Sequence, residues 1–332
     1  MTKPKYLYLQ PKGGFNDVLS VTGGCIGLCK NHNLTLLLDT FNSFYKINFA
    51  DYFSLPKKFD NVIYDHHKIK AISKDASLSV WPPQLKPHFQ DIVSGKITFM
   101  NEKMGGLQWM PFLTDQYIEL SAEEASKKGM GNKPNKWPIR AFNNDLKTVS
   151  KAVNLHPNIS RSEDILVRVA CGGNDGKHSA ILYNSFALKP VLVNHCKDLR
   201  ARLPEGYLAI QCRATDLPSD HEGLYEENKT LIHSYKSIYV ATDNISVVKF
   251  FKDKGLNVFN FSQLETLGHQ PNVGGKPPLA LHSSDMDPDR KIKDLIGDIH
   301  LVRHARELIS NSRGSFINFL RYLRKLDAGE SL

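Results

Sequence analysis

The sequence contains no apolar run long enough to cross a membrane, and its first residues lead directly into a strand-like segment. We therefore expect neither a transmembrane segment nor a signal peptide. Cysteine is scarce: the 332 residues include five, and four of these lie in apolar or helix-like surroundings. An odd number of cysteines in such places favours reduced thiols and a cytoplasmic protein.

The sequence also lacks the patterns of metal sites and of dedicated nucleic-acid binding. Cys25 and Cys29 lie one helical turn apart, but no second pair is placed to complete a zinc site. No arginine-rich block or aromatic RNA-binding motif is present, so we expect no metal and no nucleic-acid partner. The formal net charge of +9 favours anionic ligands in general, but it does not indicate which kind of anion binds.

The residues that are present alternate between strand-like and helix-like segments, which predicts an α/β protein with parallel sheets. A chain of 332 residues with 41% apolar residues can form two domains with separate cores. We expect the first domain at 1–190, the second at 191–332 and a mobile loop at 268–290. The expected strands are 6–10, 34–39, 165–170, 237–242, 256–261, 308–310 and one that begins at Tyr207, and the expected helices are 17–31, 119–128, 190–202, 245–254, 292–307 and 316–325.

A glycine-rich loop follows the first expected strand. Gly13 and Gly14 precede a helix that Asn16 or Asp17 would cap. Because helix amino termini attract anions, Gly13, Gly14 and Asn16 are candidate ligand-binding residues. The loop lacks the third glycine of the dinucleotide-binding fingerprint, and a turn that only connects the two elements is the alternative interpretation.

The strand that begins at Tyr207 ends in a polar tip that contains Arg213, Thr215 and Asp216. Ligands of open α/β sheets bind at the carboxyl ends of inner strands. The guanidinium group of Arg213 can grip a phosphate through two parallel hydrogen bonds, so the tip predicts a phosphate site. Alternatively, Arg213 pairs with Asp216 and closes the loop.

Three segments resemble the motifs of a known family, the α-1,6- and protein O-fucosyltransferases with their bacterial nodulation relatives. Residues 210–216 (IQCRATD) are similar to the His-x-Arg-x-Thr-Asp motif of that family, and residues 239–244 (YVATDN) to its Tyr-Leu-Ala-Thr-Asp-Asp segment. Residues 298–300 (DIH), followed by 311–315 (NSRGS), resemble its aspartate-bearing helix and serine-rich turn. Residues 13–17 match its glycine loop more loosely.

The resemblance implies an α/β, GT-B-like fold, in which two Rossmann-like domains face each other across a cleft. It implies an inverting, metal-independent glycosyltransferase without a cofactor, which transfers fucose from GDP-fucose to a hydroxyl group of a glycan acceptor. The carboxyl-terminal domain would bind the nucleotide sugar, and the amino-terminal domain would lie on the acceptor side. Two positions depart from the family: Gln211 replaces its histidine, and Leu217 replaces a basic residue.

The resemblance also assigns roles to individual residues. Arg213 would bind the β-phosphate, with Ser312 or Ser315 as further donors. Asp298 would bind the guanine or the ribose, and Asp243 would support Arg213 from the neighbouring strand. Ser315 would in addition cap the last helix. The remaining candidate nucleotide-binding residues are Gln211, Thr215 and Arg313.

Glycosyl transfer needs a base for the attacking hydroxyl group, and an acidic loop lies a few residues beyond Arg213. We prefer Glu222 as this base, followed by Asp220 and then His221. Arg213, Glu222 and Asp220 are therefore the candidate catalytic residues. The alternative is that these charges only solvate a loop.

Other functions stay open on the sequence alone. The same fold could use another donor sugar, such as galactose, rhamnose or xylose. Gln211 would also suit a glycan- or nucleotide-binding module without catalysis, and a phosphate-recognising protein unrelated to sugars is a third class. The sequence indicates neither the acceptor and the linkage formed nor the oligomeric state.

Overall fold

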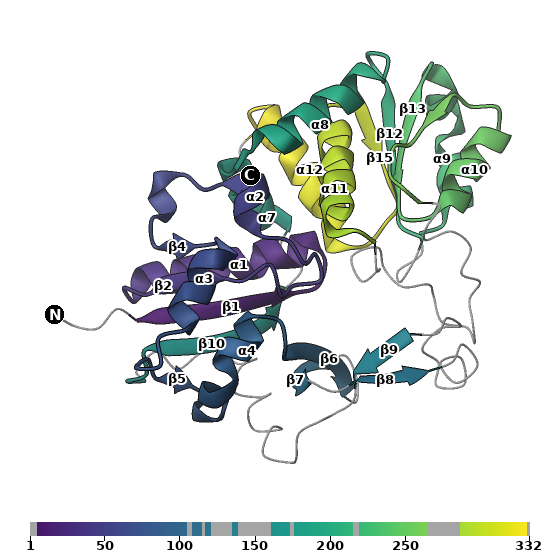
Figure 1. Ribbon diagram of the computed structural model, residues 1–332. Coiled ribbons are helices and arrows are strands. Elements are labelled where there is room, and N and C mark those ends of the chain that lie inside the picture. The colour runs from purple at the N-terminus through teal and green to yellow at the C-terminus, as the bar shows by residue number, and fades with distance from the viewer. Residues whose placement is uncertain are drawn as a thin grey trace. The chain divides into compact units, whose positions relative to one another are not determined.

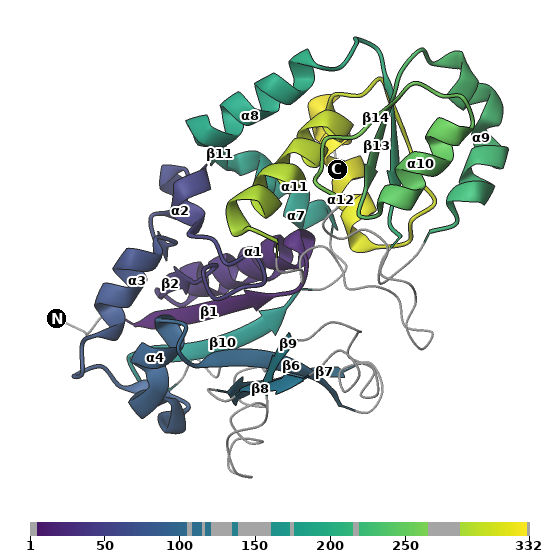
Figure 2. The ribbon, with the colours of Figure 1, turned by 45° about the vertical axis from the view of Figure 1, so that its right-hand side comes forward.

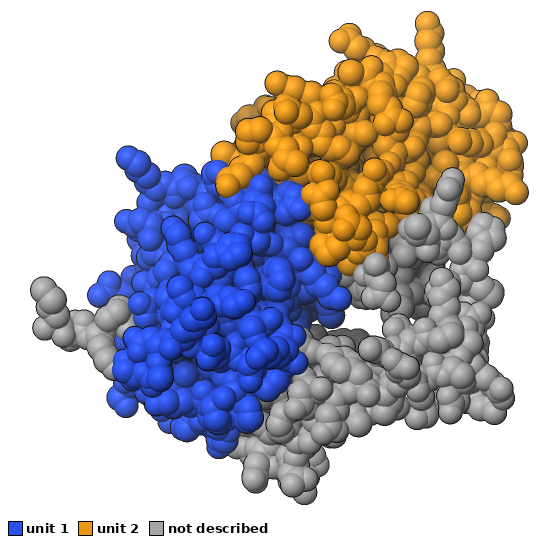
Figure 3. Space-filling model, in the orientation of Figure 1, with its two compact units in different colours: residues 1–173 blue, residues 174–332 orange. Residues whose placement is uncertain are grey.

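The computed structural model describes residues 5–104, 108–114, 117–120, 135–138, 161–172, 176–214, 219–264 and 286–330 (Figures 1 and 2). The chain forms two compact units, unit 1 at Met1–Gly173 and unit 2 at Asn174–Leu332 (Figure 3). The sequence places this boundary later, between residues 190 and 191. The difference comes from helix α7 (Gly176–Ser185), which the sequence analysis missed and which packs against α12 (Ser315–Asp327) of unit 2. This packing is close, because a Cβ atom on Gly176 would lie 2.6 Å from the backbone nitrogen of Phe319.

Unit 1 is built around a sheet of five parallel strands in the order β4-β2-β1-β10-β5. Its inner strands are almost wholly apolar, as expected for a sheet that helices cover on both faces. The strands are β1 (Tyr6–Lys12), β2 (Thr35–Leu38), β4 (Val62–Ile63), β5 (Val80–Trp81) and β10 (Ile165–Cys171), and the helices are α1 (Phe15–Asn31), α2 (Phe49–Tyr52), α3 (His66–Ser73) and α4 (Phe89–Val93).

The two faces of this sheet meet different helices. Tyr8 packs in one apolar cluster with Ile69 of α3 and Ile92 of α4, whereas α1 contacts β1 and β2 from the opposite side. Because successive residues of a strand point to opposite faces, Gln10 and Lys12 share the face of Tyr8. All three side chains are buried. The face toward α3 and α4 therefore becomes polar at the carboxyl end of β1.

The remaining elements of unit 1 lie outside this five-stranded sheet. They are β3 (Phe53–Ser54), the 3₁₀ helices Lys57–Phe59 and Pro83–His88, the antiparallel strands β6 (Thr98–Met104) and β7 (Gln108–Thr114), and the antiparallel strands β8 (Tyr117–Leu120) and β9 (Asn135–Pro138). The predicted helix at 119–128 is wrong at residues 119–120, because β8 pairs there with β9, and the rest of it lies outside the described residues. The segment 117–120 has β-favouring Tyr and Ile at its start, which the helix prediction underweighted.

Unit 2 contains a second sheet of four parallel strands in the order β14-β13-β12-β15. Its strands are β12 (Leu208–Cys212), β13 (Ile238–Thr242), β14 (Val258–Phe259) and β15 (Glu307–Ile309). The short strand β11 (Ala187–Leu188) lies outside this sheet. The helices of the unit, besides α7 and α12, are α8 (Pro190–Ala201), α9 (His221–Ser234), α10 (Ile245–Asp253) and α11 (Pro288–Arg303). Helix α11 starts before the predicted residue 292, because Asp287 caps it and Pro288 begins its first turn. Most of the predicted loop at 268–290 lies outside the described residues.

The faces of this sheet again carry different residues. Leu208, Ile210 and Cys212 pack with α9 and α10, whereas α11 contacts β12 and β13 from the other side. Tyr207 belongs to the α11 side, because its hydroxyl group donates to the carbonyl oxygen of Leu301. By the alternation of the strand, Gln211 points to the α11 side as well.

The described part of the chain thus has the α/β architecture that the resemblance predicts, with one parallel sheet in each unit. The cleft between the units stays a prediction. No helix in this part of the chain combines the length and the apolar character needed to cross a bilayer. All five cysteines are unbridged, and Cys171 is the exposed one.

Candidate functional site

The topology of unit 2 singles out the carboxyl ends of β12 and β15. From β12 the chain moves to one side of the sheet, through β13 and β14, and it returns to the other side of β12 at β15. Open α/β sheets bind ligands at such a switch point, beyond the carboxyl ends of the two strands. The residues that follow these strands are Arg213 after β12 and the segment 310–314 after β15.

The side chain of Arg213 lies near the start of α12 in space. A Cβ atom added to Gly314 would come within 3.4 Å of Arg213 Nη1, so this guanidinium group approaches the residue that precedes the helix. Gly314 occupies the cap position of α12 and, as a glycine, offers no side chain to the amides of the first turn. The prediction that Ser315 caps this helix is therefore wrong, since Ser315 is its first residue. A half-buried guanidinium beside an uncapped helix start is an arrangement that suits a phosphate.

The backbone around Arg213 is held from three sides. Its amide donates to Ser312 Oγ at 3.3 Å, and its carbonyl oxygen accepts from the backbone nitrogen and the hydroxyl group of Ser219 at 2.6 and 2.8 Å. Asp243, directly after β13, accepts a 2.7 Å hydrogen bond from the amide of Ala214. These contacts fix the direction in which the guanidinium group leaves the turn.

Gln211 has a structural partner at the same switch point. Its Oε1 accepts a 2.8 Å hydrogen bond from Ser310 Oγ, which in turn accepts from the amide of Ser312 at 3.1 Å. Gln211 is buried, with 7% of its surface exposed. In this structure the glutamine therefore joins β12 to the turn after β15 and positions Ser312.

Asp298 of α11 lies under the neighbouring strand β13. Its Oδ1 accepts hydrogen bonds from the hydroxyl groups of Tyr239 and Ser262, the latter at 2.9 Å. Burial is the main cause that raises the pKa of Asp298 to about 7. The two hydrogen bonds lower this pKa, whereas the nearby carboxylates of Asp294 and Asp243 raise it further. This carboxyl group thus changes its charge near neutral pH.

The three candidate bases differ in their exposure and in the contacts that their side chains make. Asp220 caps α9 and accepts a 2.9 Å hydrogen bond from the amide of Gly223. A side chain at position 223 would come within 2.3 Å of that carboxylate, which explains the glycine. Glu222 is exposed in the first turn of the same helix. The half-buried ring of His221 packs edge-on against Phe250, with the ring centroids 5.0 Å apart.

Two other candidates contribute less to the described site. Thr215 lies outside the described residues, and Arg313 is exposed in the turn before α12. In the ranges that the structure describes, no three His, Cys, Asp or Glu side chains form a group that could hold a metal ion. Metal independence and the absence of a cofactor therefore stay predictions.

The glycine loop of unit 1 has a different character. Gly13 has a φ of +91°, and a side chain there would meet Asp17 Oδ2 and Cys171 Sγ at 2.7 Å. Helix α1 begins at Phe15, with Gly14 in the cap position, rather than at residue 17. The amide of Gly14 donates to Asp17 Oδ2 at 2.9 Å, and Asn16 is buried in the first turn. A carboxylate of the chain therefore already accepts from the loop amide that the sequence analysis offered to an anion.

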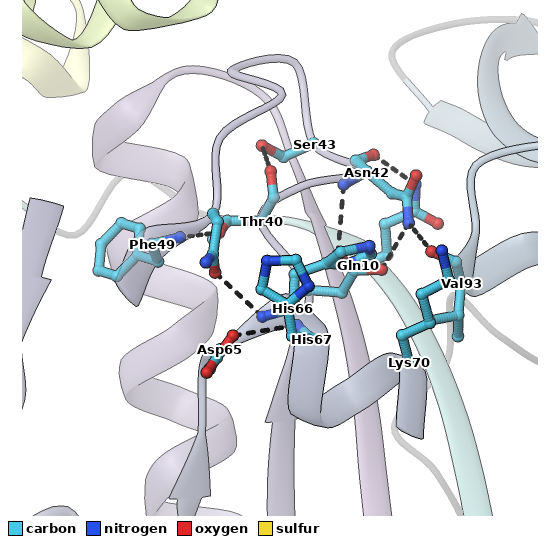
Figure 4. A network of polar contacts seen from close by, with 12 residues as sticks. Gln10, Thr40, Asn42, Ser43, Phe49, Asp65, His66, His67, Lys70 and Val93 are labelled. Carbon is cyan, nitrogen blue, oxygen red and sulfur yellow. Dashed lines mark hydrogen bonds and ion pairs between the residues drawn. The ribbon is translucent and has the colours of Figure 1, made fainter. Parts of the chain in front are cut away.

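Unit 1 contains a polar network that the sequence analysis missed. Asp39, directly after β2, accepts from the hydroxyl group of Tyr8 at 2.5 Å and from both nitrogens of Asn42, and its Oδ1 lies 3.4 Å from His66 Nδ1. Gln10 and Lys12 both donate to the carbonyl oxygen of Asn42. Figure 4 shows Gln10, Asn42 and His66 close together in this network. Its signal in the sequence is a carboxylate at the end of an apolar strand.

Burial strongly affects Lys12 in this network. Its side chain is 3% exposed, and this burial lowers the pKa of Lys12 to about 7 although the nearby Asp39 raises it. Its ammonium group donates to the carbonyl oxygen of Asn42 at 3.2 Å and lies 5.8 Å from the centre of the Phe44 ring. Lys12 thus loses charge near neutral pH, unlike an exposed lysine.

Two parallel-sheet α/β units, with a candidate phosphate site at the switch point of the second, agree with the GT-B-like fold that the resemblance implies. No family model matches the sequence, and no curated protein shows significant sequence similarity to it. Solved structures do match over almost the whole chain. The matches described next are 12–14% identical to this chain, far below the identity at which function could be inferred, so the likeness concerns the fold.

Three of these structures are fucosyltransferases. NodZ alpha-1,6-fucosyltransferase co-crystallized with GDP is 14% identical, covers 98% of this chain and 93% of its own, and has a TM-score of 0.54. The same enzyme soaked with GDP-fucose is 13% identical, covers 97% and 93%, and has a TM-score of 0.52. The apo-form of POFUT1 is 12% identical, covers 99% and 97%, and has a TM-score of 0.51.

Proposed function

We propose that this protein is a glycosyltransferase that transfers a sugar from a nucleotide diphosphate to a hydroxyl group of a glycan, with GDP-fucose as the favoured donor. The observation that carries the proposal is the position of Arg213, at the switch point of unit 2 and beside the uncapped start of α12. The GDP and GDP-fucose of the NodZ structures support this choice of donor.

The proposed chemistry is a single displacement with inversion. The acceptor oxygen attacks the anomeric carbon of the sugar, and the bond from that carbon to the β-phosphate oxygen breaks. GDP leaves with the bonding electrons, and the hydroxyl proton passes to a base of the protein. Arg213 and the first amides of α12 stabilise the charge that develops on the diphosphate, without requiring a divalent ion.

Other residues of the site support this assignment in stated roles. Ser312 and Asp243 hold the turn that carries Arg213, and Asp298 offers a carboxylate to the N–H groups of guanine. For the base we keep Glu222 before Asp220, because Asp220 already caps α9. His221 is third in this order.

A second function is a nucleotide- or glycan-binding module without catalysis. Gln211 favours it, because an amide engaged with Ser310 takes the place of the histidine of the family motif. A transferase that uses galactose, rhamnose or xylose as its donor sugar, and a phosphate-recognising protein unrelated to sugars, are further alternatives.

The test is calorimetry with GDP, UDP and CDP in buffer that contains EDTA, followed by assays of hydrolysis and transfer with a panel of nucleotide sugars. We expect GDP to bind most tightly and GDP-fucose to be turned over. Arg213→Ala should lower turnover by about 10²–10³-fold and leave the fold intact. Arg306→Ala, which removes an exposed arginine of the same unit, is the matched control.

Three outcomes would contradict the proposal. Turnover retained in Arg213→Ala would remove that residue from the mechanism. GDP binding without turnover of any nucleotide sugar would favour the binding module. A chain that binds none of the three nucleotides would exclude the transferase and would favour a module that binds glycans alone.

A further inference from the structure

The turn that follows β15, residues 310–314 (the β15 turn), contacts two segments of unit 2 that lie far from each other along the chain. On one side, Ser312 Oγ accepts a hydrogen bond from the amide of Arg213. On the other side, Asn311 Nδ2 donates to the carbonyl oxygen of Asp220 at 2.5 Å. The β15 turn therefore connects the candidate phosphate site with the start of α9, where the candidate bases lie.

The hydrogen bond from Asn311 has a defined direction. A carbonyl oxygen only accepts, so the contact identifies the NH₂ end of the Asn311 side chain. The same oxygen of Asp220 accepts the first helical hydrogen bond of α9, from the amide of Leu224 at 3.1 Å. Because a carbonyl oxygen has two lone pairs, Asn311 can use the second one and leave the helix intact.

The other end of the Asn311 side chain is unfavourable for the fold. Asn311 Oδ1 is buried and has no hydrogen-bond partner among the described residues. A buried acceptor without a partner destabilises a folded protein, so stability alone does not explain an asparagine at this position. The donor end, which holds the start of α9, accounts for it.

Ser219 fixes the same helix start from the side of β12. Its amide and its hydroxyl group donate to the carbonyl oxygen of Arg213 at 2.6 and 2.8 Å. Ser219 directly precedes Asp220, which caps α9. Two consecutive residues at the start of α9 are therefore tied to the phosphate site, Ser219 to the turn after β12 and Asp220 to the β15 turn.

We propose that Asn311 and Ser219 are positioning residues, which hold the base-bearing start of α9 in a fixed place relative to Arg213. The inference rests on the proposed function, because it concerns the base of the transfer reaction. It does not depend on which of residues 220–222 accepts the proton, since all three directly follow Ser219. Both side chains act through backbone carbonyl oxygens, so their loss should impair proton removal and leave donor binding unchanged.

Release of GDP from GDP-fucose, with water or with sodium azide as the acceptor, tests the proposal on the intact chain. Water needs a base because a proton must leave its oxygen, whereas the azide anion attacks the anomeric carbon and displaces GDP without proton transfer. With water, Asn311→Ala should lower kcat by about ten- to hundredfold and leave KM for GDP-fucose within about twofold. With azide, the same variant should equal the wild type.

Further variants separate positioning from a general loss of stability. Ser219→Ala should also slow the reaction with water, and Ser219→Thr, which keeps the hydroxyl group, should restore it. Asn257→Ala is the matched control, because Asn257 Nδ2 also donates to a carbonyl oxygen of unit 2, that of Lys236 at 3.2 Å. Its kcat should equal that of the wild type. Arg213→Ala should be slow with both acceptors, because the same diphosphate leaves in both reactions.

The outcomes distinguish this proposal from the proposed function. A wild type that releases no GDP with either acceptor would contradict both. If the wild type is active, an unchanged kcat of Asn311→Ala with water would overturn the positioning role alone. An equal loss with water and with azide would overturn it as well, because the hydrogen bond would then serve the phosphate site and not the base.

Discussion

Single residues decide where charge sits in unit 2, and Asp298 is the clearest case. Burial raises the pKa of this carboxyl group to about 7, whereas an unfolded chain would ionise it near 3.8. Between these two values the folded protein keeps the proton that the unfolded protein loses. Asp298 therefore makes the protein less stable as the pH rises from about 4 to 7. Its charge is available to a ligand only above that range.

If Asp298 binds guanine as a carboxylate, the affinity for GDP should depend on pH. We expect the affinity to fall by up to about tenfold per pH unit below pH 7 and to level off above it. Asp298→Asn should remove this dependence and bind GDP weakly at every pH, because an amide cannot accept from both N–H groups of the base. Calorimetry between pH 5.5 and 8.5 measures both curves. An equal pH slope in the wild type and in Asp298→Asn would exclude Asp298 from base recognition.

At the residue scale, the sequence predicted those polar residues that directly follow an apolar strand and belong to a recognisable motif. Arg213 and Asp243 are of this kind, and the structure brings them to one turn through Ala214. Asp39 has the same placement after β2, but it was missed because its partners Tyr8, Asn42 and His66 come from three separate segments. Spacing along the chain does not reveal such a convergence.

Glycines show how individual elements constrain the sequence. Gly172 follows β10, and a Cβ atom there would lie 2.3 Å from the carbonyl oxygen of Asp17 in α1. Gly27 is exposed within α1, and no described atom lies within 4 Å of the position of its Cβ. The first glycine is required by the close contact of a strand end with a helix, and the second only lowers helix propensity.

Substitution of these two glycines by alanine should change the free energy of unfolding in opposite directions. Gly172→Ala should lower the free energy of unfolding by about 1–3 kcal/mol, because the clash is with backbone atoms that cannot rotate away. Gly27→Ala should raise it by about 0.5–1 kcal/mol through helix propensity. Urea denaturation followed by circular dichroism compares both with the wild type. A destabilised Gly27→Ala would mean that this face of α1 is covered in solution.

Whether an element could be predicted depended on its length and its periodicity. The strands 6–12 and 165–171 and the helices 190–201 and 245–253 lie close to their expected places, because each has a continuous apolar face between clear breakers. The strands of residues 98–120 were missed, since their pairing is antiparallel and local while the neighbouring sequence is rich in proline and aromatic residues. Helix α7 was missed because its apolar stripe is short and its support comes from α12, far along the chain.

At the scale of the whole molecule, the proposed donor site belongs to unit 2 alone. The residues that carry it come from the ends of β12, β13 and β15 and from the first turn of α12. Ligand binding slows amide exchange where it holds the backbone, so the two units should respond differently to GDP.

Hydrogen–deuterium exchange with mass spectrometry tests this expectation on the intact chain. GDP should protect peptides that cover residues 208–214 and 310–318, and it should leave residues 6–14 and 35–42 unchanged. Arg213→Ala at the same GDP concentration is the control and should lose the protection. Protection confined to residues 6–14 would place the nucleotide in unit 1 and contradict the assignment.

The bond between the amide of Gly14 and the carboxylate of Asp17 has a consequence for stoichiometry. In both units a strand, a turn with glycine and a helix start meet at a switch point. Each of these two sites could in principle bind a diphosphate. In unit 1 the chain supplies an anion of its own, which acts as a permanent intramolecular competitor and repels a second negative group. The protein should for this reason saturate at one nucleotide per chain, although its architecture repeats.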